Sequence, residues 1–85
     1  MTDVVMYTRD FCEFCSAAKD LLAIKGVKLT EFNGTFDSKI RQEMMARSGR
    51  ATFPQIFIGG KHIGDCDKLY SLEDNGELDK LLAAG

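Results

Sequence analysis

The sequence lacks the features that mark several special classes of protein. It has one proline and eight glycines in 85 residues, which excludes collagen-like and proline-rich chains. Its net charge is −2, so it offers no basic surface for nucleic acid or for an anionic membrane. No apolar run approaches the roughly 18 residues that span a bilayer. These absences predict a protein that binds neither nucleic acid nor membranes.

Cysteine is also scarce, and the first residues do not resemble a signal peptide. Met1-Thr2-Asp3 begins a segment with neither a basic region nor an apolar core. Three cysteines are an odd number, and they are too few to staple a disulfide-rich mini-protein. We therefore expect reduced thiols and a cytoplasmic protein. The length leaves room for a single domain, over residues 1–85.

The sequence does contain the alternating strands and helices of an α/β protein. Strands are predicted at residues 3–8 and 27–32, the first buried and the second with one buried face. Two more strands, at 55–58 and 61–64, are joined by Gly59-Gly60, which is a strong hairpin signal. Together with the intervening helices, these strands predict one mixed sheet of four strands.

Apolar residues at helical spacing predict three helices. The first runs over residues 14–24. In the second, Phe36, Ile40 and Met44 step by four residues and form the apolar face. The third begins after Asp65, which can cap it. Its apolar residues are Leu69, Leu72, Leu78, Leu81 and Leu82. The resulting order is βαβαββα, with helices flanking the sheet.

The most informative motif is Cys12-Glu13-Phe14-Cys15, which lies where the first strand gives way to the first helix. At a helix start, the first sulfur lies beside unpaired backbone N–H groups and the positive end of the dipole. Both favour the thiolate, which is the nucleophilic form. The second sulfur lies on the next turn and can close a disulfide with the first. The motif therefore predicts a redox pair, and the plain alternative is two buried cysteines without a role.

A zinc site is another interpretation of these cysteines. His62 and Cys66 would complete a ligand set of three cysteines and one histidine together with Cys12 and Cys15. Zinc modules usually replace a missing core, however, and this chain has apolar strands and helices of its own. His62 lies in a predicted strand, where an exposed imidazole explains it. We therefore expect no metal site.

Two further segments could bind an extended, peptide-like ligand. Thr52-Phe53-Pro54 contains the only proline, which either starts a strand or has a cis bond that turns backbone groups of Phe53 toward a ligand. Asp65-Cys66-Asp67 opens the last helix, where N–H groups could receive a carboxylate and Asp67 an amine. The alternative is that these aspartates only cap the helix.

Taken in order, these motifs resemble the glutaredoxins over essentially the whole chain. The resemblance is closest to the small bacterial dithiol members. It is carried by three segments: Tyr7-Thr8-Arg9 before the C-x-x-C motif, residues 50–60, and His62-Ile63-Gly64-Asp65-Cys66-Asp67. It implies a thioredoxin-like fold with sheet order 2-1-3-4 and a cis bond at Phe53-Pro54. It further implies a protein that uses glutathione as reductant, and we expect a monomer.

The resemblance also implies roles for individual residues. Cys12 would be the nucleophile and Cys15 the resolving thiol, acting on glutathionylated proteins and on proteins with disulfides. Arg9 and Arg41 would meet the glycine carboxylate of glutathione, and Phe53 would pair with its cysteinyl backbone. The full glutathione-binding set that it implies is Arg9, Phe14, Arg41, Thr52, Phe53, Pro54, Cys66 and Asp67. Of these, the Cys66 N–H and Asp67 would hold the γ-glutamyl end.

The active-site motif departs from the family's usual C-P-Y-C, because Glu13 and Phe14 replace the proline and the tyrosine. Glutaredoxins without this proline resemble members that hold a [2Fe–2S] cluster between two subunits, with the first cysteine of each and two glutathiones. A cluster carrier is therefore the alternative function. Thioredoxin itself fits less well, because the chain has no tryptophan and lacks the W-C-G-P-C motif.

Overall fold

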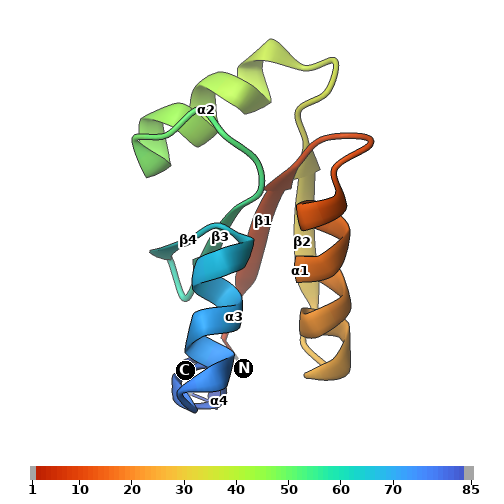
Figure 1. Cartoon of the computed structure of the whole chain (residues 1–85). Coiled ribbons are helices and arrows are strands. Elements are labelled where there is room, and N and C mark those ends of the chain that lie inside the picture. Colours follow the sequence, from red (N-terminus) through yellow and green to blue (C-terminus); the bar gives the residue numbers. More distant parts are fainter. Residues whose placement is uncertain (1, 84–85) are drawn as a thin grey trace.

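The computed structural model describes residues 2–83, and it shows one sheet with helices on both faces (Figure 1). The predicted domain extends to residues 1 and 84–85, which lie outside the described part. The strands are β1 (Val4–Thr8), β2 (Leu29–Asn33), β3 (Gln55–Ile58) and β4 (Lys61–Gly64). Their order is β2-β1-β3-β4, with β1 parallel to β2 and antiparallel to β3. The predicted order 2-1-3-4 is therefore confirmed.

Three helices cover one face of the sheet and one helix covers the other. The helices are α1 (Glu13–Ile24), α2 (Ser38–Ser48), α3 (Cys66–Asp74) and α4 (Glu77–Ala83). The larger core joins α1, α3 and α4 to β1 and β3, where Met6 and Ile56 are fully buried. None of the helices in residues 2–83 has the length and hydrophobicity that crossing a membrane requires.

The face under α2 has a small core that is completed by polar contacts. Met44 is the buried residue of α2, and it packs with Tyr7 and Phe57 of the sheet. The Tyr7 hydroxyl donates to Glu43 and accepts a hydrogen bond from Arg47 Nη1 at 2.9 Å. The Arg47 guanidinium also lies 4.2 Å from the centre of the Phe57 ring. Met44, the partly buried Ile40 and a polar network therefore hold α2 to the sheet.

Two of the helix predictions need correction. Asp37 caps α2 by accepting the N–H groups of Lys39 and Ile40 at 3.0 and 3.2 Å, so the helix begins at Ser38. Phe36 therefore precedes the helix and is 95% exposed, instead of lying on its buried face. The predicted last helix is two helices, because the chain turns at Gly76 with a φ of 79°, a conformation that glycine adopts without strain.

The second strand also differs from its prediction. β2 begins at Leu29, two residues later than predicted, and its residues after Leu29 are exposed. It pairs with β1 alone and forms an edge of the sheet, so the expected buried face is reduced to a partly buried Leu29. The exposed end of β2 leads into the loop that carries Phe36, close to the motif cysteines.

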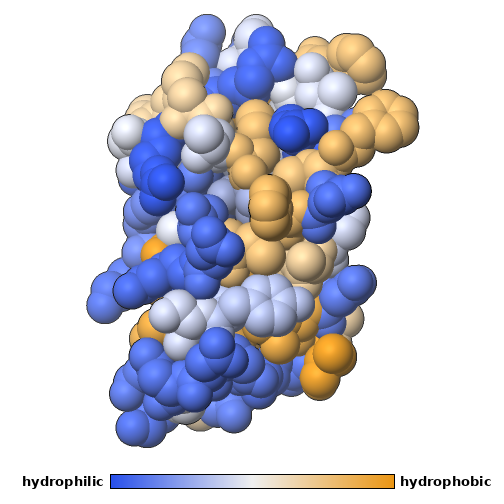
Figure 2. Space-filling view, viewed as in Figure 1, coloured by the Kyte–Doolittle hydropathy of each residue, from blue (hydrophilic) through white to orange (hydrophobic). Residues whose placement is uncertain are grey.

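Hydrophobic side chains gather on one part of the surface. In the view of Figure 2 they occupy the centre and the upper right, above the start of α1, while the lower part is largely hydrophilic. Three large apolar residues near the start of α1 and in the loops beside it are strongly exposed: Phe11 at 99%, Phe14 at 63% and Phe36 at 95%.

Candidate active site

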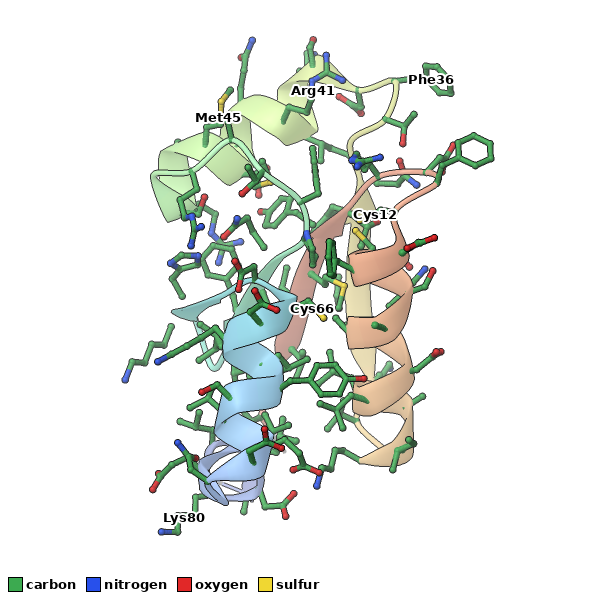
Figure 3. All side chains as sticks on the ribbon, viewed as in Figure 1. Cys12, Phe36, Arg41, Met45, Cys66 and Lys80 are labelled. Atoms are coloured by element: carbon green, nitrogen blue, oxygen red, sulfur yellow. The ribbon has the colours of Figure 1, made fainter. Side chains whose placement is uncertain are left out.

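The two motif cysteines lie at the N-terminus of α1, as predicted (Figure 3). Cys12 is the N-cap residue, and its sulfur accepts the backbone N–H of Cys15 at 3.1 Å. Both thiols are free and buried, with Cys12 6% exposed and Cys15 2%. A backbone donor and a helix N-terminus directed at a sulfur stabilise its negative charge. The structure therefore places Cys12, and not Cys15, at the N-cap of α1.

The second thiol has a different electrostatic environment. Burial, followed by the hydrogen bond with Cys12, raises the pKa of the Cys15 thiol to about 12, while the backbone N–H of Arg9 acts in the opposite direction. A thiol that keeps its proton is a weak nucleophile at neutral pH. The environments of Cys12 and Cys15 therefore suit a first and a second nucleophile.

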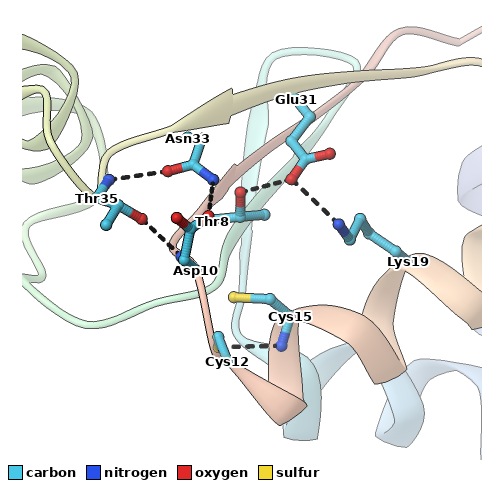
Figure 4. Close-up of polar contacts among 8 residues, drawn as sticks. All are labelled: Thr8, Asp10, Cys12, Cys15, Lys19, Glu31, Asn33 and Thr35. Carbon is cyan, nitrogen blue, oxygen red and sulfur yellow. Dashed lines mark hydrogen bonds and ion pairs between the residues drawn. The ribbon is translucent and has the colours of Figure 1, made fainter.

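The loop before Cys12 is held in an unusual conformation. Phe11 has a φ of 55°, a left-handed conformation that costs a residue with a side chain about 1–2 kcal/mol. The Arg9 guanidinium donates to the carbonyl oxygens of Asp10 and Phe11 at 3.2 and 3.4 Å. The Asp10 N–H donates to Thr35 Oγ1 at 2.6 Å (Figure 4). These contacts compensate the strained turn and fix the loop to the segment after β2.

A first cavity of about 240 Å³ lies beside the motif and contains most of the predicted glutathione-binding residues. Six of them line it: Phe14, Thr52, Phe53, Pro54, Cys66 and Asp67. The Phe53-Pro54 bond is cis, so that prediction is confirmed. Arg50 and Asp65 complete the lining, and neither belongs to the predicted set. Both lie within the segments that carry the family resemblance, and their opposite charges were the available signal.

The charges around the first cavity are arranged in a way that suits a zwitterionic ligand. Arg50 Nη2 lies 3.7 Å from Asp65 Oδ2, and Asp65 Oδ1 caps α3 by accepting the N–H of Lys68 at 3.0 Å. Asp67 is exposed in the first turn of α3 and forms no ion pair with the rest of residues 2–83. The cavity therefore presents a guanidinium, a helix N-terminus and an unpaired carboxylate.

Cys66 is the third thiol of the region. It begins α3, which packs beside α1, and its side chain is 6% exposed (Figure 3). Burial raises the pKa of the Cys66 thiol, and the charges of Asp67 and Asp65 raise it further. It therefore stays protonated at neutral pH. The raised pKa makes Cys66 a poor competitor of Cys12 for a disulfide.

The two arginines of the predicted set do not line the first cavity. Arg9 borders a second cavity, and Arg41 lines neither of the two. The Arg41 guanidinium donates through Nη1 to the carbonyl oxygens of Gly34 and Thr35 at 2.7 and 3.1 Å. Each arginine therefore braces a loop next to the site. The glutathione contacts that the resemblance implied for them remain predictions.

The second cavity, of about 460 Å³, lies between the motif and β2. Cys12 and Cys15 line it together with polar residues of α1 and β2. Within it, the Glu31 carboxylate accepts hydrogen bonds from Thr8 Oγ1 at 2.6 Å and from Lys19 Nζ at 3.2 Å (Figure 4). The motif thus has a cavity with apolar and charged walls on one side and a strongly polar cavity on the other.

The zinc ligands considered in the sequence are not brought together. Between residues 2 and 83, no three or more His, Cys, Asp or Glu side chains are placed to hold a metal ion. His62 Nε2 lies 2.8 Å from Gln55 Oε1, and its ring packs 5.1 Å from that of Phe57. His62 is thus half-buried in the sheet, instead of exposed as the sequence suggested. The described part of a single chain therefore forms no such cluster.

Comparison with known proteins gives concordant results. Residues 4–63 match the family model for glutaredoxin. The chain is 49% identical to Glutaredoxin 3 of Escherichia coli strain K12 over 82 residues, which cover 96% of this chain and 99% of that protein. Among solved structures, it is similar to the solution structure of glutaredoxin from Brucella melitensis, with 55% identity, a TM-score of 0.84, and coverage of 96% of this chain and 89% of that one. The crystal structure of a buckwheat glutaredoxin–glutathione complex has 30% identity and a TM-score of 0.86, over 95% of this chain and 76% of that one.

Proposed function

Because the chain belongs to the glutaredoxin family, whose members are generally thiol–disulfide oxidoreductases, we propose that it reduces protein–glutathione mixed disulfides and protein disulfides with glutathione as reductant. The observation that carries the proposal is the position of Cys12 at the N-terminus of α1, beside a cavity lined by Phe53, Pro54 and the start of α3. The reaction needs a compartment that keeps thiols reduced, which agrees with the predicted cytoplasmic location.

The first reaction begins with attack by the Cys12 thiolate on the glutathione sulfur of a mixed disulfide. A bond forms between Cys12 Sγ and that sulfur, the original disulfide bond breaks, and the protein thiolate leaves and takes a proton from water. A second glutathione thiolate then attacks the glutathione sulfur on Cys12. Oxidised glutathione leaves, and the Cys12 thiolate is restored. This route needs no second cysteine.

Reduction of a protein disulfide uses both motif cysteines. Cys12 forms a mixed disulfide with the substrate, and the Cys15 thiolate attacks Cys12 Sγ, which releases the second substrate thiol and leaves a Cys12–Cys15 disulfide. Two glutathiones reduce this disulfide in two exchanges. Because burial raises the pKa of Cys15, its step is slow at neutral pH. We therefore expect mixed disulfides with glutathione to be the faster substrates.

Glutathione carries two carboxylates and one ammonium, and the first cavity offers partners for these charges. In our proposal the γ-glutamyl end lies at the start of α3, where backbone N–H groups face its carboxylate and Asp67 faces its ammonium. Phe53 pairs with the cysteinyl backbone, with Thr52 and Pro54 beside it. Arg9 and Arg41 use Nη1 for their loop contacts, so their other N–H groups are left to bind the glycine carboxylate.

The test is reduction of a glutathionylated peptide, coupled to glutathione reductase, in the parent and in two variants. Cys12→Ser should abolish the activity, because no nucleophile remains at the helix N-terminus. Cys15→Ser should keep the reduction of glutathionylated peptide but lose the reduction of a peptide with an internal disulfide. Activity that survives in Cys12→Ser but not in Cys15→Ser would reverse the proposed roles.

The same preparation separates the enzyme from the alternative cluster carrier. A single chain supplies no complete ligand set, so a [2Fe–2S] cluster would need Cys12 of two chains and two glutathiones. Anaerobic reconstitution with iron, sulfide and glutathione would then give visible absorbance and a dimer. A colourless monomer that reduces glutathionylated peptide supports the enzyme, and a coloured dimer without this activity supports the carrier.

A further inference from the structure

Large aromatic side chains surround the motif but are not part of the core. Phe11 and Phe36 are 99% and 95% exposed, and Phe14 is 63% exposed. We call these three residues the phenylalanine rim. Figure 2 shows hydrophobic side chains concentrated in this part of the face. Scattered apolar residues are normal on a surface, but a group of exposed aromatic rings around a functional site is typical of an interaction surface.

The rim is assembled from segments that the fold ties together. Phe11 follows Asp10 in the loop after β1, and Phe36 follows Thr35 in the loop after β2. The Asp10 N–H donates to Thr35 Oγ1 at 2.6 Å, so the two rings extend from adjoining loops. Asn33 Nδ2 also donates to Asp10 Oδ1 at 2.8 Å. Phe11 precedes Cys12 in the chain, and Figure 3 shows Phe36 on the adjoining loop with its ring directed outward.

Arg9 and Arg41 hold these two loops in place through hydrogen bonds to backbone carbonyl oxygens. Arg9 donates to the carbonyls of Asp10 and Phe11, and Arg41 donates to those of Gly34 and Thr35. These contacts order the two loops before any ligand arrives. A surface that is ordered in advance loses less conformational entropy on binding. The two loops of the rim are thus ordered before binding, although the phenylalanine side chains of the rim do not pack into the core.

Unpaired charge around the two cavities is mainly negative. Among the charged residues that line them, Lys19 pairs with Glu31 and Arg50 with Asp65. The remaining charges are the carboxylates of Asp10, Glu13 and Asp67 and the guanidinium of Arg9. Asp67 and Arg9 are assigned to glutathione in the proposed function, which leaves the carboxylates of Asp10 and Glu13 for the partner. These two charges favour a cationic partner, and they do so more strongly at low salt.

We propose that the phenylalanine rim binds the protein portion of a disulfide substrate, as an extended segment with a large apolar residue and a basic residue beside its cysteine. The inference rests on the proposed function and adds a substrate preference to it. The Cys12 sulfur is buried, so a substrate disulfide that reaches it must bring its flanking residues over the rim. Glutathione has the first cavity on the other side of the motif, where only Phe14 is shared.

The inference is tested with glutathionylated peptides that differ only beside the cysteine. One peptide carries leucine and lysine there, a second carries glycine and lysine, and a third carries leucine and glutamate. The mixed disulfide of cysteine and glutathione serves as a substrate without a protein portion. In the parent, kcat/KM should be highest for the leucine–lysine peptide, and added salt should reduce its advantage over the leucine–glutamate peptide.

The test variant is Phe11→Asn with Phe36→Ser, because asparagine tolerates the left-handed backbone at residue 11. It should lower kcat/KM for the leucine–lysine peptide about tenfold, through KM, since truncation of buried aromatic anchors commonly has effects of this size. The small mixed disulfide should react as in the parent. The matched control is Ile24→Ser, which removes an apolar side chain that is 80% exposed at the far end of α1. This control variant should leave kcat/KM unchanged for both substrates.

Several results would overturn the inference. If the double variant lost kcat/KM equally for all substrates, the loops would support catalysis generally. If it lost no kcat/KM for any peptide, the rim would bind no part of the substrate. A parent dimer that becomes a monomer in the double variant would make the rim a contact between two copies. If the parent fails to reduce even the small mixed disulfide, the proposed function fails. The binding role of the rim is then tested separately by fluorescence anisotropy. The probe is the leucine–lysine peptide with serine in place of cysteine, and it should bind the parent more tightly than it binds the double variant.

Discussion

Raising the pH should accelerate the step that Cys15 performs. Burial and the Cys12 contact raise the pKa of Cys15 from 9.0 to about 12. At pH 7 this leaves about one Cys15 thiol in 10⁵ ionised, against about one in 100 for a thiol with the ordinary value. Because the thiolate is the nucleophile, the resolving step should be slower at pH 7 than an unperturbed thiol would allow.

A mixed disulfide at Cys12 changes part of this environment. The sulfur of Cys12 is then uncharged and bonded to the substrate, so its contribution to the raised pKa falls. Burial, the larger cause, remains. The pKa of Cys15 should therefore stay above its ordinary value of 9.0, and the rate should rise about tenfold per pH unit up to at least pH 9.

The assay uses an aromatic disulfide such as dithiobis(nitrobenzoate) in stopped flow, without glutathione. Attack by Cys12 releases one coloured thiolate, and attack by Cys15 on the resulting mixed disulfide releases a second. The leaving thiolate stays ionised from pH 6 to 10, so the second phase reports the ionisation of Cys15. Cys15→Ser should release one equivalent, and Cys66→Ser should keep both phases. A second phase that levels off below pH 9, or that is as fast at pH 7 as at pH 9, would refute the reasoning.

Three further outcomes are expected. Asp67→Asn should raise the KM for glutathionylated peptide about tenfold or more through loss of a charge-assisted hydrogen bond, whereas Asp74→Asn at the other end of α3 should not change it. Met44→Ala should lower the free energy of unfolding by about 2–5 kcal/mol in denaturant titrations, and the exposed Met45→Ala by about 0.5 kcal/mol or less. Tyr7→Phe should cost about 1 kcal/mol at pH 7. Burial, and next the Glu43 contact, raise the pKa of Tyr7 above 10.0, so the parent should lose more stability than this variant as the pH rises above 10.0.

The parts of the fold that depend on local pattern could be predicted from the sequence. The apolar run of β1, the glycine-linked hairpin of β3 and β4, and the spacing of α1 each identify an element within a few residues. The motif at the β1–α1 junction places Cys12 at a helix N-terminus, because the end of a strand and the start of a helix are both visible in the sequence. The position of the two motif cysteines was therefore predicted correctly.

The errors occurred where two local signals competed. At the start of α2, the four-residue spacing of Phe36 and Ile40 suggested one apolar face, but the capping contacts of Asp37 begin the helix after Phe36. At the end of the chain, the leucine spacing suggested one helix, but Gly76 lets the backbone turn between α3 and α4. In both places a single backbone contact or conformation outweighed the hydrophobic pattern.

The sequence by itself determined the order of strands and helices, the C-x-x-C motif and the kinds of side chain that could contact a ligand. These features depend on residues that are close together in the chain. Only the tertiary structure decided which of those residues meet. It brings Phe14, Phe53 and Asp67 to one cavity from three separate segments, and it joins Asp10 in the loop after β1 to Thr35 in the loop after β2. The exposure of Phe36 and the raised pKa of Cys15 were decided in the same way. Burial and hydrogen-bond partners arise from neighbours that are distant in the chain, so no local pattern contains them.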